Sequence, residues 1–148
     1  MNAFQELFSN RVLLCAITSW MVAQVLKFLL NLWIHKKMDW RRFFGMGGMP
    51  SAHSAFVFSL SLATGIGEGF DSIAFALAFA LMAIVIYDAM GVRAETGKQG
   101  AVLNHILREV LIEGQPITEE RLKELVGHTP LEVLGGVLIG ALMALIMM

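Results

Sequence analysis

The segment GGMPSAHS, residues 47 to 54, combines groups that can bind a phosphate with a side chain that can move a proton. Pro50 lacks an N–H and suits the first position of a helix, so a helix is predicted to begin there. The N–H groups of Ser51, Ala52 and His53 then point out of a helix end whose dipole favours anions. His53 can donate a proton near neutral pH. In the alternative interpretation, Ser51 only caps the helix and His53 hydrogen-bonds a carbonyl group.

Two charged residues further along the chain suit the same anion. Asp88 lies near the end of an apolar stretch, and Arg93 stands five residues after it. The planar guanidinium of Arg93 matches two phosphate oxygens, and the Asp88 carboxylate can orient it or act as a base. The alternative for Asp88 is a salt bridge to Lys27 between helices. Asp88 and Glu95 could instead bind a divalent cation, but two carboxylates form a weak metal signal, and neither a metal site nor a cofactor is predicted.

A polar stripe runs along the first apolar stretch. Its members recur at helical spacing and are Trp20, Gln24, Lys27, Asn31 and His35. Polar groups are unfavourable in lipid, so this stripe is predicted to face the interior of a helical bundle. For Lys27 two interpretations stay open, because its side chain can face the site or extend to the lipid headgroups.

The elements that must position these residues are membrane helices. The chain has 148 residues, of which 57% are hydrophobic and only 16% are charged, a balance typical of integral membrane proteins. We expect an all-α, compact bundle in one domain, residues 1–148, with one or two cytoplasmic surface helices in segment 94–127. The four predicted transmembrane helices cover residues 12–34, 51–67, 72–90 and 131–148.

Basic residues predict how the bundle is oriented. The connection HKKMDWRRFFGMGGM and the segment after the third apolar stretch are rich in lysine and arginine, whereas the connection EGFD has none. Lysine and arginine mark cytoplasmic loops, so both termini are predicted outside and the site inside. The single cysteine, Cys15, excludes a disulfide within the chain.

The last apolar stretch carries local helix signals. Thr129, Pro130 and Glu132 form the pattern of a capping box, which favours a capping role over a catalytic one for Glu132. Small residues follow at a spacing of four, and they are Gly136, Gly140 and Ala144. Such a series permits close contact between helices, either within the bundle or in a homo-oligomer.

The segments GMPSAHSA, YDAMGVRAETGKQGAVLN and GHTPLEVLGG resemble the divergent branch of the type-2 phosphatidic acid phosphatase superfamily, which is related to acid phosphatases and vanadium-dependent haloperoxidases. The resemblance covers nearly the whole chain. It implies a phosphatidic-acid-phosphatase-like core, a bacterial plasma membrane, and a phosphate-bearing lipid or small phosphate ester as partner. No nucleic-acid partner is expected.

The parent superfamily uses the motifs K-x6-R-P, P-S-G-H and S-R-x5-H-x3-D. The second motif matches here as residues 50–53, which implies that His53 protonates the leaving group. The third matches only through Arg93, because Gln99 stands where the attacking histidine is expected. Lys27 is only an approximate counterpart of the first-motif lysine.

Two histidines at other spacings, His105 and His128, could replace the missing nucleophile. Two hypotheses follow. In the first, the protein binds, and with a replacement nucleophile or water hydrolyses, a phosphate or pyrophosphate monoester, with lipid as the expected carrier, at the cytoplasmic membrane face. In the second, it is a noncatalytic anionic-lipid-binding, carrier or scaffold protein. In the first, the phosphate-binding residues are Lys27, Ser51, Ala52 and Arg93, and the catalytic ones are His53 and Asp88.

Overall fold

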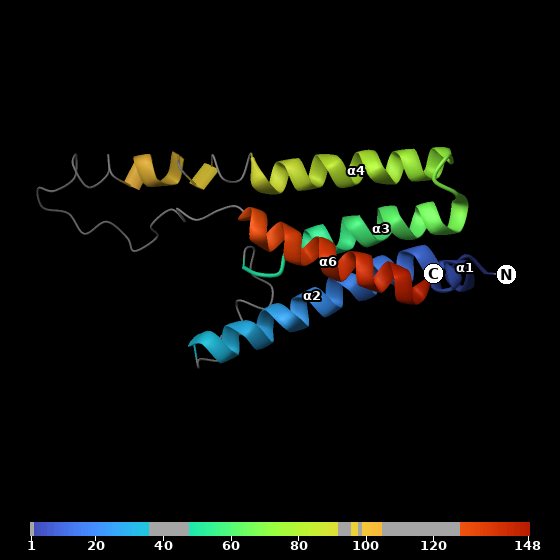
Figure 1. Ribbon diagram of the computed structural model, residues 1–148, viewed down its shortest axis with the longest axis horizontal. Coiled ribbons are helices and arrows are strands. Elements are labelled where there is room, and N and C mark those ends of the chain that lie inside the picture. The colour runs from blue at the N-terminus through green and yellow to red at the C-terminus, as the bar shows by residue number, and fades with distance from the viewer. Residues whose placement is uncertain (1, 36–47, 92–95, 98, 105–127) are drawn as a thin grey trace, which may run out of the picture.

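A computed structural model describes residues 2–35, 48–91, 96–97, 99–104 and 128–148. Its labelled helices are α1 (Ala3–Ser9), α2 (Arg11–His35), α3 (Ala52–Glu68), α4 (Ile73–Met90) and α6 (Pro130–Met147) (Figure 1). Residues 96–97 and 99–104 are also helical. Within these ranges the chain contains helices and no strand, which confirms the all-α prediction.

Three of the helices are long and apolar enough to cross a membrane, and they cover Arg11–Ile34, Ile73–Met90 and Pro130–Met147. The fourth predicted span corresponds to α3, which has 17 residues. At about 1.5 Å per residue it extends over roughly 26 Å, less than the hydrocarbon thickness of about 30 Å. The prediction of four membrane-spanning helices is therefore met for three of them.

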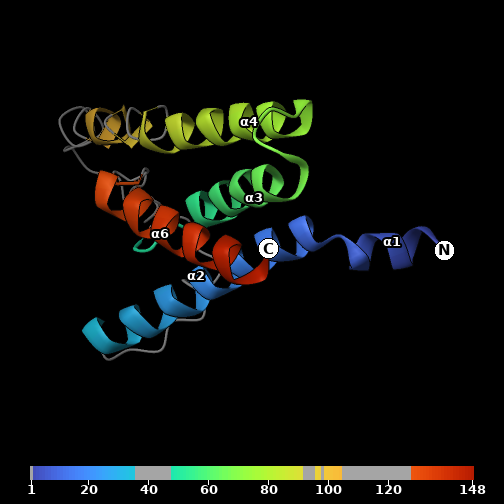
Figure 2. The ribbon, with the colours of Figure 1, turned by 45° about the vertical axis from the view of Figure 1, so that its right-hand side comes forward.

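α3 lies at the centre of the bundle, where it contacts α2, α4 and α6 (Figures 1 and 2). This position explains its polar sequence, because the three surrounding helices shield it from lipid. Its buried hydroxyls donate to carbonyls of the same helix, as Ser59 Oγ does to Phe56 O at 3.0 Å and Thr64 Oγ1 to Leu60 O at 2.7 Å. These two hydroxyl groups are thus satisfied within the helix and without water, as a membrane interior requires.

The small residues of α6 allow it to pack closely on α3. A Cβ atom at Gly140 would stand 2.7 Å from the carbonyl oxygen of Ala55, and one at Gly136 would collide with the carbonyl oxygen of Ser51. Ala144 is completely buried and packs with Cys15 and Ala63. Of the two alternatives for this series, the structure shows contact within the bundle.

The short connection between α3 and α4 makes them antiparallel neighbours. Gly69 adopts a φ of 95°, which favours glycine, and Ser72 caps α4 by accepting from the N–H of Phe75 at 3.1 Å. The start of α3 therefore lies at the same end of the bundle as the end of α4 and the start of α6. α1 and the end of α6 lie at the opposite end (Figure 1).

Candidate functional site

The first turn of α3 begins later than the sequence predicts. Ser51 is the N-cap with extended backbone angles, and the helix starts at Ala52, so Pro50 precedes the cap and is not the first helical residue. The hydroxyl oxygen of Ser51 accepts from the N–H of Ser54 at 3.3 Å and from its hydroxyl at 3.0 Å. The prediction that Pro50 is the first helical residue is wrong. The hydroxyl oxygen of Ser51 accepts from an N–H of the first turn, and so Ser51 is the N-cap.

The backbone of Ser51 also forms a hydrogen bond with α6. Its N–H donates to the carbonyl oxygen of Glu132 at 2.9 Å, and the residue is completely buried. The expectation that this N–H is available to a ligand is therefore wrong, and the capping interpretation of Ser51 is the one the structure supports. The N–H of Ala52 has no acceptor among the described residues, which leaves it as a donor at this helix end.

The start of α6 matches the predicted capping box. The N–H of Glu132 donates to Thr129 Oγ1 at 3.3 Å, and the N–H of Thr129 donates to Glu132 Oε2 at 2.9 Å. Pro130 occupies the first turn, as expected. The Glu132 carboxylate is thus held at the helix end, and its negative charge acts on Lys27 of α2.

Lys27 lies inside the bundle beside the approach to α3. Its side chain is only 9% exposed, and its Cδ lies 3.7 Å from the position that a Cβ of Gly48 would take. Gly48 has a φ of 92°, so the chain needs glycine there in any case. The structure supports the site-facing interpretation of Lys27 over extension to the headgroups.

The predicted polar stripe of α2 faces inward only in part. Gln24 and Lys27 are buried, and Asn31 is half-buried. Trp20 is 36% exposed, and the side chain of His35 lies outside the described residues. Buried polar side chains in a membrane bundle usually line a site or pair with a partner.

Two histidines distant in sequence meet at the start of α3. The ring centroids of His53 and His128 lie 6.0 Å apart, with an angle of 75° between the ring planes. His128 is 5% exposed, and its backbone N–H donates to the carbonyl oxygen of Ala89 at 3.0 Å. This contact brings together α3, α4 and the residues before α6. The sequence shows His128 only as one unplaced histidine, and no local pattern links it to His53.

The spacing of the two rings limits what they can do. A phosphoryl group attacked by one imidazole and protonated by the other needs about 3 Å on each side. The two rings are in edge-to-face contact, so His128 is the second histidine at the start of α3. Its role as a replacement nucleophile stays a prediction.

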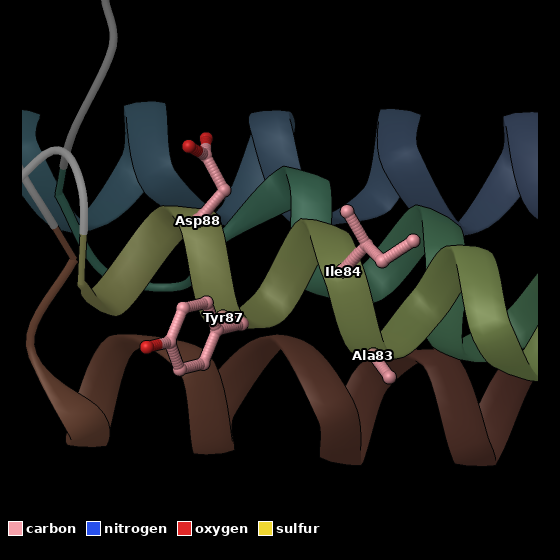
Figure 3. A pocket seen from close by; sticks show the side chains of 4 residues that line it. All are labelled: Ala83, Ile84, Tyr87 and Asp88. Atoms are coloured by element: carbon pink, nitrogen blue, oxygen red, sulfur yellow. The ribbon is translucent and has the colours of Figure 1, made fainter.

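Asp88 lies on the flank of α4. It is half-buried and lines an open hollow of about 470 Å³ together with Ala83, Ile84 and Tyr87. Figure 3 shows the side chains of Asp88 and Tyr87 leaving the helix in different directions. The charged lining group of this hollow is a carboxylate, so the hollow itself does not attract phosphate. Asp88 precedes Ala89, whose carbonyl oxygen accepts from the backbone N–H of His128, so it lies at the same end of the bundle as the start of α6.

The remaining predicted site residues follow α4 in the sequence. Arg93, Glu95 and His105 lie outside the described residues, and so does most of the predicted cytoplasmic segment 94–127. Gln99 is exposed on the helical residues 99–104. Within the described ranges, no group of three or more histidine, cysteine or acidic side chains could hold a metal ion.

Comparison with known proteins identifies relatives of the whole chain. A family model described as the divergent PAP2 family matches residues 8–143. The chain is also 34% identical, over 152 aligned residues that cover 96% of each protein, to a Bacillus subtilis (strain 168) protein called uncharacterized membrane protein YuiD. No solved structure matches the chain.

Proposed function

The chain belongs to the divergent PAP2 family, and from this membership we propose that it is a phosphatase-like membrane protein that binds a phosphate or pyrophosphate monoester, with lipid as the expected carrier. The binding site lies where α2, α3 and the start of α6 meet. Buried Lys27 beside the first turn of α3 carries the proposal. A cation enclosed in a membrane bundle calls for an anionic partner. The Glu132 carboxylate lies near Lys27 but already accepts from the N–H of Thr129, and we assign the phosphate as a further partner.

Each residue has a defined role in this proposal. The ammonium of Lys27 and the N–H of Ala52 hold the phosphate, and Arg93 adds a guanidinium by analogy with the third family motif. Ser51 shapes the helix end instead of binding the ligand through its own N–H. His53 protonates the leaving oxygen, and its ring contact with His128 supports this role.

Turnover requires a nucleophile other than residue 99. In the proposed reaction a water oxygen attacks phosphorus and the ester P–O bond breaks. Asp88 accepts the proton of the water, and the leaving oxygen takes a proton from His53. The site faces the cytoplasm in this proposal, as the distribution of basic residues predicts.

Purified protein in detergent micelles tests the proposal, with phosphatidic acid as probe and released phosphate as readout. We expect release to be abolished in His53→Ala and in Arg93→Ala, because each change removes a group that acts on the phosphoryl charge. Glu68→Gln, at the far end of α3, is the matched control and should retain release. Release that survives both of the first two changes excludes this mechanism.

Gln99 in place of the attacking histidine favours the second candidate function, a noncatalytic anionic-lipid-binding, carrier or scaffold protein. This candidate predicts saturable binding of vanadate or phosphatidic acid with no released phosphate. Gln99→His should then introduce turnover if the rest of the site is intact. Release by the wild-type protein would exclude the noncatalytic candidate.

A further inference from the structure

Gln24 has an unsatisfied acceptor in the interior of the bundle. The residue is 9% exposed, and its Oε1 is fully buried without a hydrogen-bond partner among the residues that the structure describes. A buried polar group without a partner is unfavourable, and native proteins seldom retain one without a use.

The position of Gln24 places this acceptor at the proposed phosphate site. It precedes Lys27 by three residues, which puts both side chains on one face of α2. The adjacent Ala23 packs against Ala52 and Ala55, in the first turn of α3. Gln24 is therefore level with the helix end from which the N–H of Ala52 is available.

The chemistry of Gln24 complements that of its neighbours. Lys27 and the Ala52 N–H can only donate hydrogen bonds, as suits the unprotonated oxygens of an anion. A glutamine Oε1 can only accept, so among the atoms of a phosphate ligand it can pair only with an O–H. A fully unprotonated anion offers none, whereas a ligand that carries both negative charge and a hydroxyl satisfies the donors and the acceptor together.

We propose that Gln24 is a specificity-determining residue that accepts a hydrogen bond from an O–H group of the phosphate ligand. This inference rests on the proposed phosphate site. The O–H has two sources, the P–OH of a singly protonated phosphate or an alcohol next to the phosphoester. Ligands without such a group leave Oε1 buried and unpaired, and so bind more weakly.

Two pairs of probes separate these sources in equilibrium binding to the whole protein in micelles. Inorganic phosphate and sulfate have similar shape, but only phosphate carries a proton near neutral pH. Lysophosphatidate and its 2-deoxy analogue differ only in the alcohol. We expect wild-type protein to prefer the O–H member of one or both pairs by about tenfold.

Gln24→Leu and Gln24→Met remove the acceptor and keep the approximate volume of the side chain. Both should lose the preference and unfold at a temperature no lower than wild type, because an unpaired polar group has been removed. Equal binding within both pairs by wild type, or an unchanged preference in the variants, would overturn the role of Gln24. A lower unfolding temperature in both variants would overturn it too, because Oε1 would then have a structural partner. If wild type binds none of the four probes, the proposed phosphate site fails, and this inference with it.

Discussion

At the scale of single residues, the site depends on which polar groups the bundle leaves unused. The sequence predicts that the N–H of Ser51 faces the ligand, but it donates to the carbonyl oxygen of Glu132 in α6, and the Ser51 hydroxyl oxygen accepts from Ser54. Lys27, which had two open interpretations, lies inside the bundle. Among the described residues, we therefore propose Lys27 and the N–H of Ala52 as the anion-binding groups.

Lys27→Met tests the proposed cation. The change removes the charge and keeps a side chain of similar reach, so the affinity for phosphatidic acid should fall at least about tenfold, as for loss of a charge-assisted contact. The unfolding temperature should not fall, because a desolvated charge has been removed from an apolar bundle. Binding at the wild-type level by a folded Lys27→Met protein would show that the ammonium does not contact the ligand.

Ser51→Ala tests the N-cap of α3, with Ser72→Ala as a matched control at the cap of α4. Each change removes a serine oxygen that accepts from an N–H in the first helical turn, so each should lower the free energy of unfolding by about 1 kcal/mol. Only Ser51→Ala should also weaken phosphate binding, because only α3 begins at the site. Equal loss of binding in both variants would point to general destabilisation.

At the scale of elements, α3 is a short polar helix that three apolar helices enclose. This arrangement depends on the absence of side chains on α6 where the two helices touch. The pattern of small residues predicted a close helix contact, and the buried contacts show that the partner is α3 of the same chain.

Gly136→Ala tests this contact, with Gly135→Ala as the neighbouring control. A Cβ at residue 136 would collide with the backbone of Ser51, whereas one at residue 135 would lie 3.4 Å from the Cβ of Pro50. Gly136→Ala should therefore lower the free energy of unfolding by about 1–3 kcal/mol and weaken phosphate binding. Gly135→Ala should remain near wild type in thermal unfolding. The reverse order would contradict this packing.

At the scale of the whole molecule, the start of α3 and the two chain ends lie at opposite ends of the bundle (Figure 1). The sequence assigns the site to the cytoplasm because basic residues flank the helix ends around it. An enzyme or carrier in this orientation would meet phosphate groups of the inner leaflet.

Labelling of introduced cysteines tests the orientation in a Cys15→Ser background. Asn2→Cys should react with a membrane-impermeant maleimide in intact cells, because α1 lies at the predicted outer end. Gln99→Cys, which is also exposed, should react only after permeabilisation. The opposite labelling pattern would place the site outside.

Composition and local patterns were sufficient to predict an all-α membrane protein, the approximate bounds of its helices and the capping box at Thr129. These features depend on residues close in sequence, where helical spacing and caps determine the outcome. Three other features appear only in the folded bundle. They are the ring contact of His53 with His128, the hydrogen bond from the Ser51 N–H to the carbonyl oxygen of Glu132, and the buried acceptor of Gln24. They join helices far apart in the chain, and whether a polar group is used or left for a ligand depends on which helix packs against it.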